Sequence, residues 1–172
     1  MKPPRWVWVA LVWAALALPG SAAGRGIEWR RWEEGVGISG RVGRHLLAYF
    51  HDPACRFCRR MDAKTFTAPE VQKVAQRCFV PVRVEIAGLG PEGLASAQLV
   101  QRYRVLIFPT LLVLDFRNPA KELMRLKGYV DPKDLVDFLR YVTDRWYREM
   151  SFDAFVERLL NGRLPARATG MC

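Results

Sequence analysis

Cys55-Arg56-Phe57-Cys58 follows an apolar run, HLLAYF at residues 45–50, and the turn-like His51-Asp52-Pro53. The run is rich in aromatic and aliphatic side chains and predicts a buried strand. Residues from Cys55 to about Lys64 contain no Gly or Pro and favour a helix. The sequence therefore predicts a Cys-x-x-Cys motif at the junction of a strand and a helix.

The spacing of the two cysteines suits reversible disulfide chemistry. Residues three apart on a helix are neighbours, with Cα atoms roughly 5 Å apart, which is within disulfide range. Because a helix N-terminus favours an anion, Cys55 is the expected nucleophile. Cys58, one turn further in, would attack the mixed disulfide that Cys55 forms with a substrate. Arg56, Arg59 and Arg60 would either favour the thiolate further or form an ordinary solvated helix surface.

Asp52-Pro53 leaves two possible starts for this helix. An Asp cap followed by Pro at the first helical position would begin the helix earlier and place Cys55 inside its first turn. The helix dipole would act on Cys55 in either case. A capping carboxylate so close to the thiol would nevertheless oppose thiolate formation.

Two other uses of a Cys-x-x-Cys pair fit this sequence less well. A closed zinc site usually takes four ligands, often as two spaced pairs, and here the further candidates are scattered: Cys78, Cys172, His45 and His51. A purely structural disulfide across two residues would close a very small loop and constrain little of the unfolded chain. We therefore expect no metal and no other cofactor at this motif.

The rest of the chain alternates strand and helix patterns, which predicts an α/β fold. The order indicates an initial parallel β-α-β unit, an antiparallel hairpin and a closing helix, in which Asp131 is the N-cap and Pro132 the first helical residue. The expected elements are a partly helical lead-in at 27–43, strands at 45–50, 79–86, 110–116 and 123–126, and helices at 55–64, 68–77, 92–103, 131–142 and 152–160.

The first residues have the pattern of an export signal. Lys2 and Arg5 precede an uninterrupted apolar run, Trp6 to Leu18, and small residues follow up to Ala23. The run has thirteen residues, fewer than the roughly 20 needed to cross a bilayer. Residues 1–23 are therefore predicted to be a secretory signal peptide, with an uncleaved signal anchor as the alternative. The mature chain would be soluble and periplasmic, or otherwise exported, without a stable membrane span.

The chain is strongly basic. Its formal net charge is +10, and losing Lys2 and Arg5 with the signal peptide would leave +8. A basic surface favours acidic partners or membrane headgroups. Nucleic acid is not expected as a partner, because the chain carries an export signal and no recognised nucleic-acid-binding motif.

Two further cysteines lie outside the motif. Cys78 precedes a core strand and is expected to be a small buried residue. Cys172 ends the chain, and three interpretations stay open for it: an inert terminus, an intermolecular cross-link or an accessory thiol.

A second motif, Phe108-Pro109-Thr110, follows the first by about fifty residues and begins another strand. Together with the Trp-rich lead-in and the Cys-x-x-Cys-Arg-Arg-Met run, it makes residues 27–143 resemble the thioredoxin superfamily. The resemblance is greatest to exported thioredoxin-like domains, which are similar to the C-terminal periplasmic domain of the bacterial transmembrane thiol:disulfide interchange protein.

This resemblance implies a thioredoxin fold, with a central mixed sheet flanked by helices, in residues 24–143. Residues 144–172 would form a C-terminal helical extension and flexible tail. The resemblance also implies a cis Phe108–Pro109 bond facing Cys55, with the backbone before Pro109 pairing with the substrate. Cys55 and Cys58 are then the catalytic residues, and the substrate-binding residues are Arg56, Phe57, Phe108 and Pro109.

The sequence departs from the thioredoxin pattern in two places. Thioredoxins carry a buried acid six residues before the first cysteine, where it assists proton removal from the second, and Tyr49 stands there instead. The dipeptide between the cysteines, Arg56-Phe57, matches neither thioredoxin nor the strong oxidases. Because the redox potential depends on that dipeptide, the direction of electron flow stays open.

The function that these features favour is thiol–disulfide exchange with a cysteine-containing client protein in the periplasm. A thiol electron donor in the membrane or periplasm would return the pair to its reduced form. The alternative is a binding module that uses the same groove to hold a peptide or deliver copper without redox turnover.

Overall fold

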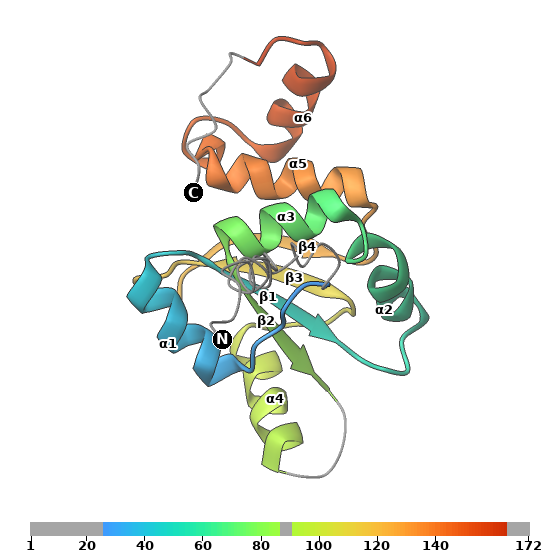
Figure 1. The fold of residues 1–172 in the computed structure, drawn as a ribbon, viewed down its shortest axis with the longest axis vertical. Helices are drawn as coiled ribbons and strands as arrows, with labels where there is room; N and C mark the ends of the chain where they lie inside the picture. Colours follow the sequence, from blue (N-terminus) through green and yellow to red (C-terminus); the bar gives the residue numbers. More distant parts are fainter. Residues whose placement is uncertain (1–25, 87–90, 165–172) are drawn as a thin grey trace, which may run out of the picture.

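The computed structural model describes residues 26–86 and 91–164, in which a four-stranded sheet carries helices on both faces (Figure 1). The strands are β1 (Leu46–His51), β2 (Val80–Glu85), β3 (Thr110–Leu114) and β4 (Glu122–Lys127), in the order β2-β1-β3-β4. β1 is parallel to β2 and antiparallel to β3, and β3 and β4 form an antiparallel hairpin. The predicted mixed sheet and its connectivity are confirmed.

β1 is central because both of its faces are apolar. All six of its residues are buried, and successive side chains point to opposite faces of a strand. Leu46, Ala48 and Phe50 join one core cluster, whereas Leu47 and Tyr49 join the other. Such a strand is stable only where helices cover the sheet on both sides.

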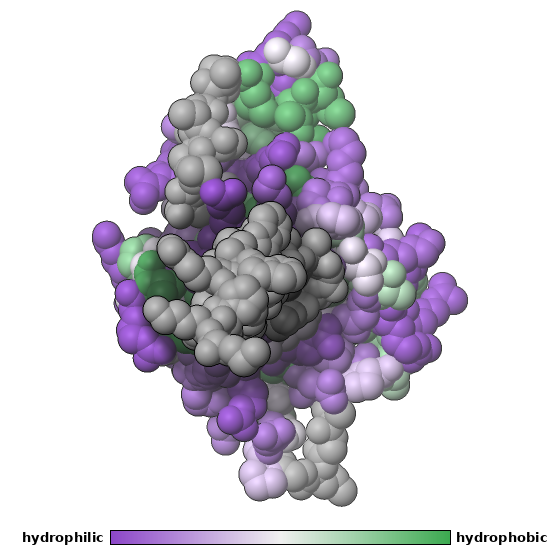
Figure 2. Space-filling view, in the orientation of Figure 1, coloured by the Kyte–Doolittle hydropathy of each residue, from purple (hydrophilic) through white to green (hydrophobic). Residues whose placement is uncertain are grey.

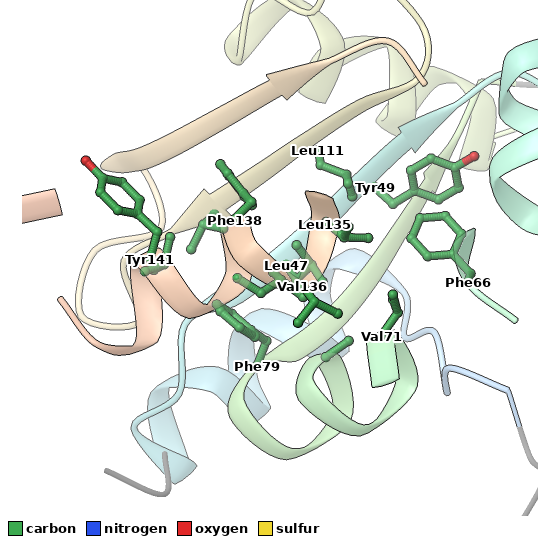
Figure 3. Packing of buried hydrophobic residues seen from close by; sticks show 14 of the residues in the cluster. Leu47, Tyr49, Phe66, Val71, Phe79, Leu111, Leu135, Val136, Phe138 and Tyr141 are labelled. Carbon is green, nitrogen blue, oxygen red and sulfur yellow. The ribbon is translucent and has the colours of Figure 1, made fainter. Parts of the chain in front are cut away.

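Helices α3 (Pro69–Cys78) and α5 (Pro132–Thr143) cover the face that contains Leu47 and Tyr49 (Figure 3). Helix α6 (Phe152–Leu160) extends this layer, since the ring of Phe155 lies 5.1 Å from that of Tyr141 on α5. The buried side chains on this face include Leu47, Tyr49, Val71, Phe79, Leu111, Leu135 and Phe138.

Helices α1 (Trp32–Val42) and α4 (Pro91–Arg102) lie on the opposite face. α1 approaches β2 so closely that a Cβ atom on Gly35 would lie 2.2 Å from Cγ2 of Val82. Gly40, in the same helix, has no neighbour within 4 Å of such an atom. Gly35 lowers the helix propensity of α1, but its lack of a side chain is required for the close packing of α1 on β2.

One local expectation is wrong. The helix predicted for 55–64 is a short α2 (Arg56–Arg60) followed by a π-helical turn, Met61–Thr65. The wider turn, closed by the Phe66 N–H donating to the Met61 carbonyl at 3.0 Å, buries Met61, Thr65 and Phe66 together. Asp131 is the N-cap residue of α5 and Pro132 its first residue, as predicted, although the Asp131 carboxylate accepts from the Tyr129 hydroxyl at 2.8 Å and makes no cap hydrogen bond.

On the face shown in Figure 2, the described side chains are mostly hydrophilic, with a hydrophobic group over α6. Leu160 on this helix is 72% exposed. Within residues 26–86 and 91–164, no helix combines the length and the apolar character that crossing a membrane requires. The predicted signal peptide, 1–23, and the tail from residue 165 on, with Cys172, lie outside the described residues.

The packing of α1 gives a prediction with a built-in control. Gly35→Ala should destabilise the protein by about 1–3 kcal/mol, because the new methyl group overlaps Val82. Gly40→Ala should instead stabilise it by about 0.5–1 kcal/mol, the usual gain from replacing an exposed helical glycine. Urea unfolding of both variants measures the two effects. Equal changes in the free energy of unfolding would contradict the close packing of α1 on β2.

Candidate active site

Cys55 is the N-cap residue of α2. The chain leaves β1 through a turn in which Asp52 Oδ1 accepts from the Ala54 N–H at 2.7 Å and the Asp52 carbonyl accepts from the Cys55 N–H at 3.0 Å. Cys55 then has an extended backbone, and its Sγ accepts from the Cys58 N–H at 3.3 Å. The expected helix N-terminus is confirmed, whereas the alternative with Asp52 as the cap is wrong because Asp52 is used in the preceding turn.

The two cysteines of the motif have free thiols in unequal environments. Cys55 is partly exposed, whereas Cys58 is fully buried. Burial raises the pKa of the Cys58 thiol to about 12, although hydrogen bonds from the Asp52 backbone and the Tyr49 side chain lower it. A reagent in solution therefore meets Cys55 first.

The second motif lies against the first. The Phe108–Pro109 peptide bond is cis, as the resemblance implies. The Cys55 thiol donates to the Phe108 carbonyl oxygen, with 3.5 Å between Sγ and O. The structure thus brings Cys55, Cys58 and Phe108 together from segments about fifty residues apart in the chain.

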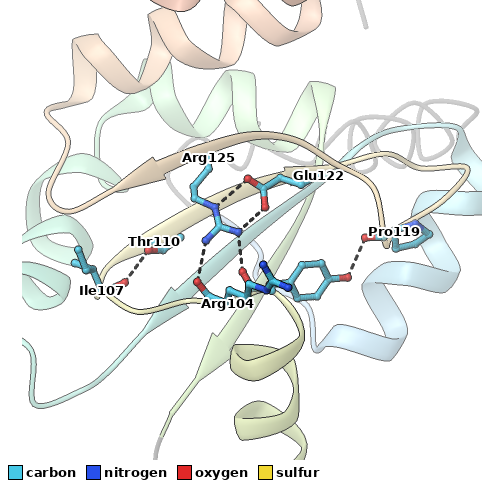
Figure 4. A network of polar contacts seen from close by, with 7 residues as sticks. Arg104, Ile107, Thr110, Pro119, Glu122 and Arg125 are labelled. Atoms are coloured by element: carbon cyan, nitrogen blue, oxygen red, sulfur yellow. Dashed lines mark hydrogen bonds and ion pairs between the residues drawn. The ribbon is translucent and has the colours of Figure 1, made fainter.

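The loop before Pro109 is fastened by polar contacts (Figure 4). Arg125 on β4 donates to the carbonyls of Tyr103 and Arg104 at 2.7 and 3.2 Å and forms an ion pair with Glu122. Thr110 Oγ1 donates to the Ile107 carbonyl at 2.6 Å. Arg125 was not predicted, because its role depends on a strand pairing and a loop path that no local pattern encodes.

Large apolar side chains are exposed around Cys55. Phe57 is 41% exposed, and Leu106 and Ile107, which precede Phe108, are 89% and 53% exposed. The arginines differ in their contacts: Arg56 lies over the Phe57 ring, and Arg59 donates to the Pro53 and Ala54 carbonyls. Of these apolar residues only Phe57 was predicted; exposed side chains at 106 and 107 could have been suspected from their place beside the Pro-Thr motif.

Beneath the cysteines, Tyr49 occupies the position of the family's buried acid. It is fully buried, and its hydroxyl donates to the Cys58 carbonyl at 3.2 Å. Next to it, Asp62 and Arg83 form an ion pair, and His51 Nε2 lies 3.1 Å from a Glu85 carboxylate oxygen. Among the described residues, no cluster of three or more His, Cys, Asp or Glu side chains is arranged to hold a metal ion.

Cys78 differs from its expected state. It ends α3, is only partly buried and is disulfide-bonded. The prediction of a small buried residue is therefore wrong. Sequence patterns report burial near a core strand, but they carry no information on whether a cysteine forms a disulfide.

A family model described as a thioredoxin-like domain matches residues 38–143. The chain belongs to the thioredoxin-like family. Its fold is similar to that of a thioredoxin from Thermus thermophilus, with 28% identity and a TM-score of 0.59, over 69% of this chain and 88% of that one.

Two further solved structures share the fold of this thioredoxin-like protein. A putative disulphide-isomerase from Bacteroides thetaiotaomicron has 23% identity and a TM-score of 0.56, covering 76% of this chain and 99% of its own. The DsbH oxidoreductase has 20% identity and a TM-score of 0.56, covering 67% and 85%. No protein among those with curated descriptions matches the sequence.

The unequal environments of the two thiols predict their reactivity. In the reduced protein at neutral pH, iodoacetamide should modify Cys55 first and Cys58 at least about tenfold more slowly, because the thiolate is the reacting species. Since its raised pKa keeps Cys58 protonated, its reaction should accelerate steadily from about pH 7 to about pH 10. Mass mapping of alkylated peptides measures both rates. Faster labelling of Cys58 would show that the buried arrangement is wrong.

Proposed function

We propose that this protein is an exported thiol–disulfide oxidoreductase that exchanges disulfides with cysteine-containing client proteins through Cys55 and Cys58. One observation carries the proposal: an accessible sulfur at a helix N-terminus accepts the N–H of a buried cysteine directly behind it. Membership of the thioredoxin-like family and the similarity to a thioredoxin support it.

The reaction has two steps. The Cys55 thiolate attacks a client disulfide, forming a Cys55–client disulfide and releasing one client thiolate. The Cys58 thiolate then attacks Cys55 Sγ, which forms the Cys55–Cys58 disulfide and releases the second client thiolate. Two electrons pass to the client, and the reverse sequence oxidises a client dithiol. A thiol electron donor of the membrane or periplasm would reduce the pair again.

The surface around Cys55 favours an extended client segment. The Phe108 carbonyl and Pro109 offer a backbone edge beside the reacting sulfur, where a client strand could pair. Phe57 would contact apolar client side chains, and Arg56 beside it supplies positive charge for acidic ones. We therefore assign client binding to Arg56, Phe57, Phe108 and Pro109.

Export rests on residues 1–23 of the sequence, with their basic start and apolar run. The disulfide of Cys78 suits an oxidising compartment, because structural disulfides persist there and are rare in the cytosol. We propose the periplasm as the location.

Trapping of clients tests the mechanism. Cys58→Ala, expressed with the N-terminal segment, should accumulate mixed disulfides with client proteins, because nothing releases Cys55 once it has reacted. Cys55→Ala is the matched control and should trap far less. Non-reducing gels followed by mass spectrometry of reductant-released proteins measure the difference and identify the clients.

The two-cysteine mechanism would be contradicted if the wild-type protein reduced a disulfide substrate, such as insulin, while the Cys58→Ala variant formed no mixed disulfide at Cys55. If wild type and variant are both inert with insulin and with extracts of oxidised periplasmic proteins, the protein is a binding module instead.

A further inference from the structure

Tyr49 is a buried polar residue in contact with Cys58, the cysteine that attacks, or resolves, the mixed disulfide between Cys55 and the client. Its ring is fixed by Trp29 at 5.4 Å, Phe66 at 4.7 Å and a stacked His51 at 5.1 Å between centroids. Its hydroxyl donates to the Cys58 carbonyl at 3.2 Å, and the nearby hydroxyl lowers the pKa of the Cys58 thiol, in opposition to burial. The packing therefore holds one hydroxyl donor against Cys58.

The resolving step needs a thiolate where burial disfavours one. Cys58 is fully buried, and loss of hydration is the main cause of its raised thiol pKa. A neighbouring carboxylate would oppose its ionisation further, whereas a neutral hydroxyl donor stabilises the anion without adding negative charge.

Two pairs of titratable side chains lie around Tyr49. Asp62, from the π-helical turn, is bonded to Arg83 of β2. His51 lies beside Glu85, and burial, aided by Arg83, lowers its pKa, so its imidazole is neutral at neutral pH. Burial, with the charge of Asp62 as a second cause, raises the pKa of Tyr49, so its hydroxyl keeps its proton throughout the working range.

We propose that Tyr49 is a positioning residue for the resolving step: its hydroxyl donates a hydrogen bond to the Cys58 sulfur as that sulfur becomes a thiolate. The proposal rests on the proposed function. The Cys58 proton passes to solvent, the Cys58 thiolate forms a bond to Cys55 Sγ, the bond from Cys55 to the client breaks, and the client thiolate takes a proton from solvent. Tyr49 keeps its own proton, so it replaces the family's acid as a donor and not as a base.

The test isolates this step with a chromogenic thiol. Reduced protein is loaded at Cys55 with thionitrobenzoate, and release of that group reports the attack by Cys58. Tyr49→Phe should slow release about tenfold at neutral pH, the size expected from losing one hydrogen bond to a charged acceptor. The rise of the rate with pH should also move to higher pH, while alkylation of Cys55 in the fully reduced variant stays unchanged.

Tyr141→Phe is the matched control. Tyr141 is also buried, and its hydroxyl also donates to a backbone carbonyl, that of Met150, in the layer of α5 and α6. This variant should release thionitrobenzoate at the wild-type rate. A second measurement replaces every tyrosine by fluorotyrosine, whose more acidic hydroxyl is a stronger hydrogen-bond donor. This replacement should speed release in the wild-type sequence and leave the rate unchanged in Tyr49→Phe, which has no tyrosine at that position.

The outcomes separate the two proposals. If wild type releases no thionitrobenzoate, the proposed function fails. If wild type releases it and Tyr49→Phe does so at the same rate and with the same pH profile, the role of Tyr49 is refuted. An equal slowing in Tyr141→Phe would likewise refute it, because general loosening of the core would then explain the effect.

Discussion

Burial of β1 on both faces is the constraint on which the site depends. Because its side chains pack alternately against α3 and α5 and against α1 and α4, the strand can neither slide nor rotate without exposing apolar surface. Its last residue, His51, therefore fixes where the turn at Asp52 begins and where Cys55 starts α2. The position of a reactive sulfur is set by the core of the sheet.

The same packing makes the two thiols unequal. The turn ends at the surface, so Cys55 is accessible, and one helical turn later the chain has entered the core, so Cys58 is buried. The Cys58 N–H points at Cys55 Sγ, which links the two cysteines even in the reduced protein. On the far side, Arg125 and Thr110 hold the Phe108 carbonyl beside Cys55. The packed sheet and the hydrogen bonds of Arg125 and Thr110 thus fix the positions of Cys55, Cys58 and Phe108 relative to one another.

Much of this was predictable from local patterns. The apolar run before Asp52 and the alternation at 79–86 depend on neighbours in sequence, and they predicted strands. The approach of Phe108 to Cys55 was implied only by the resemblance to the thioredoxin superfamily, which the Cys-x-x-Cys and Pro-Thr motifs carry. The hydrogen bond from Thr65, in the π-helical turn, to the Val130 carbonyl and those from Arg125 to the loop before Pro109 join segments far apart in the sequence. Local patterns also do not report that Cys78 forms a disulfide. Asp131 was predicted as the N-cap of α5, but local patterns do not report that its carboxylate bonds Tyr129 and not the helix N–H groups.

The central claim is that Cys55 and Cys58 form one reversible disulfide. Equilibrating the mature protein in glutathione buffers of graded potential, followed by acid quenching and mass analysis of the peptide that carries both cysteines, tests it most directly. The two thiols are expected to disappear together along a two-electron curve, in which the ratio of dithiol to disulfide changes tenfold for about 30 mV. A stable glutathione adduct on Cys55 with Cys58 still reduced, or two thiols that never oxidise, would contradict it.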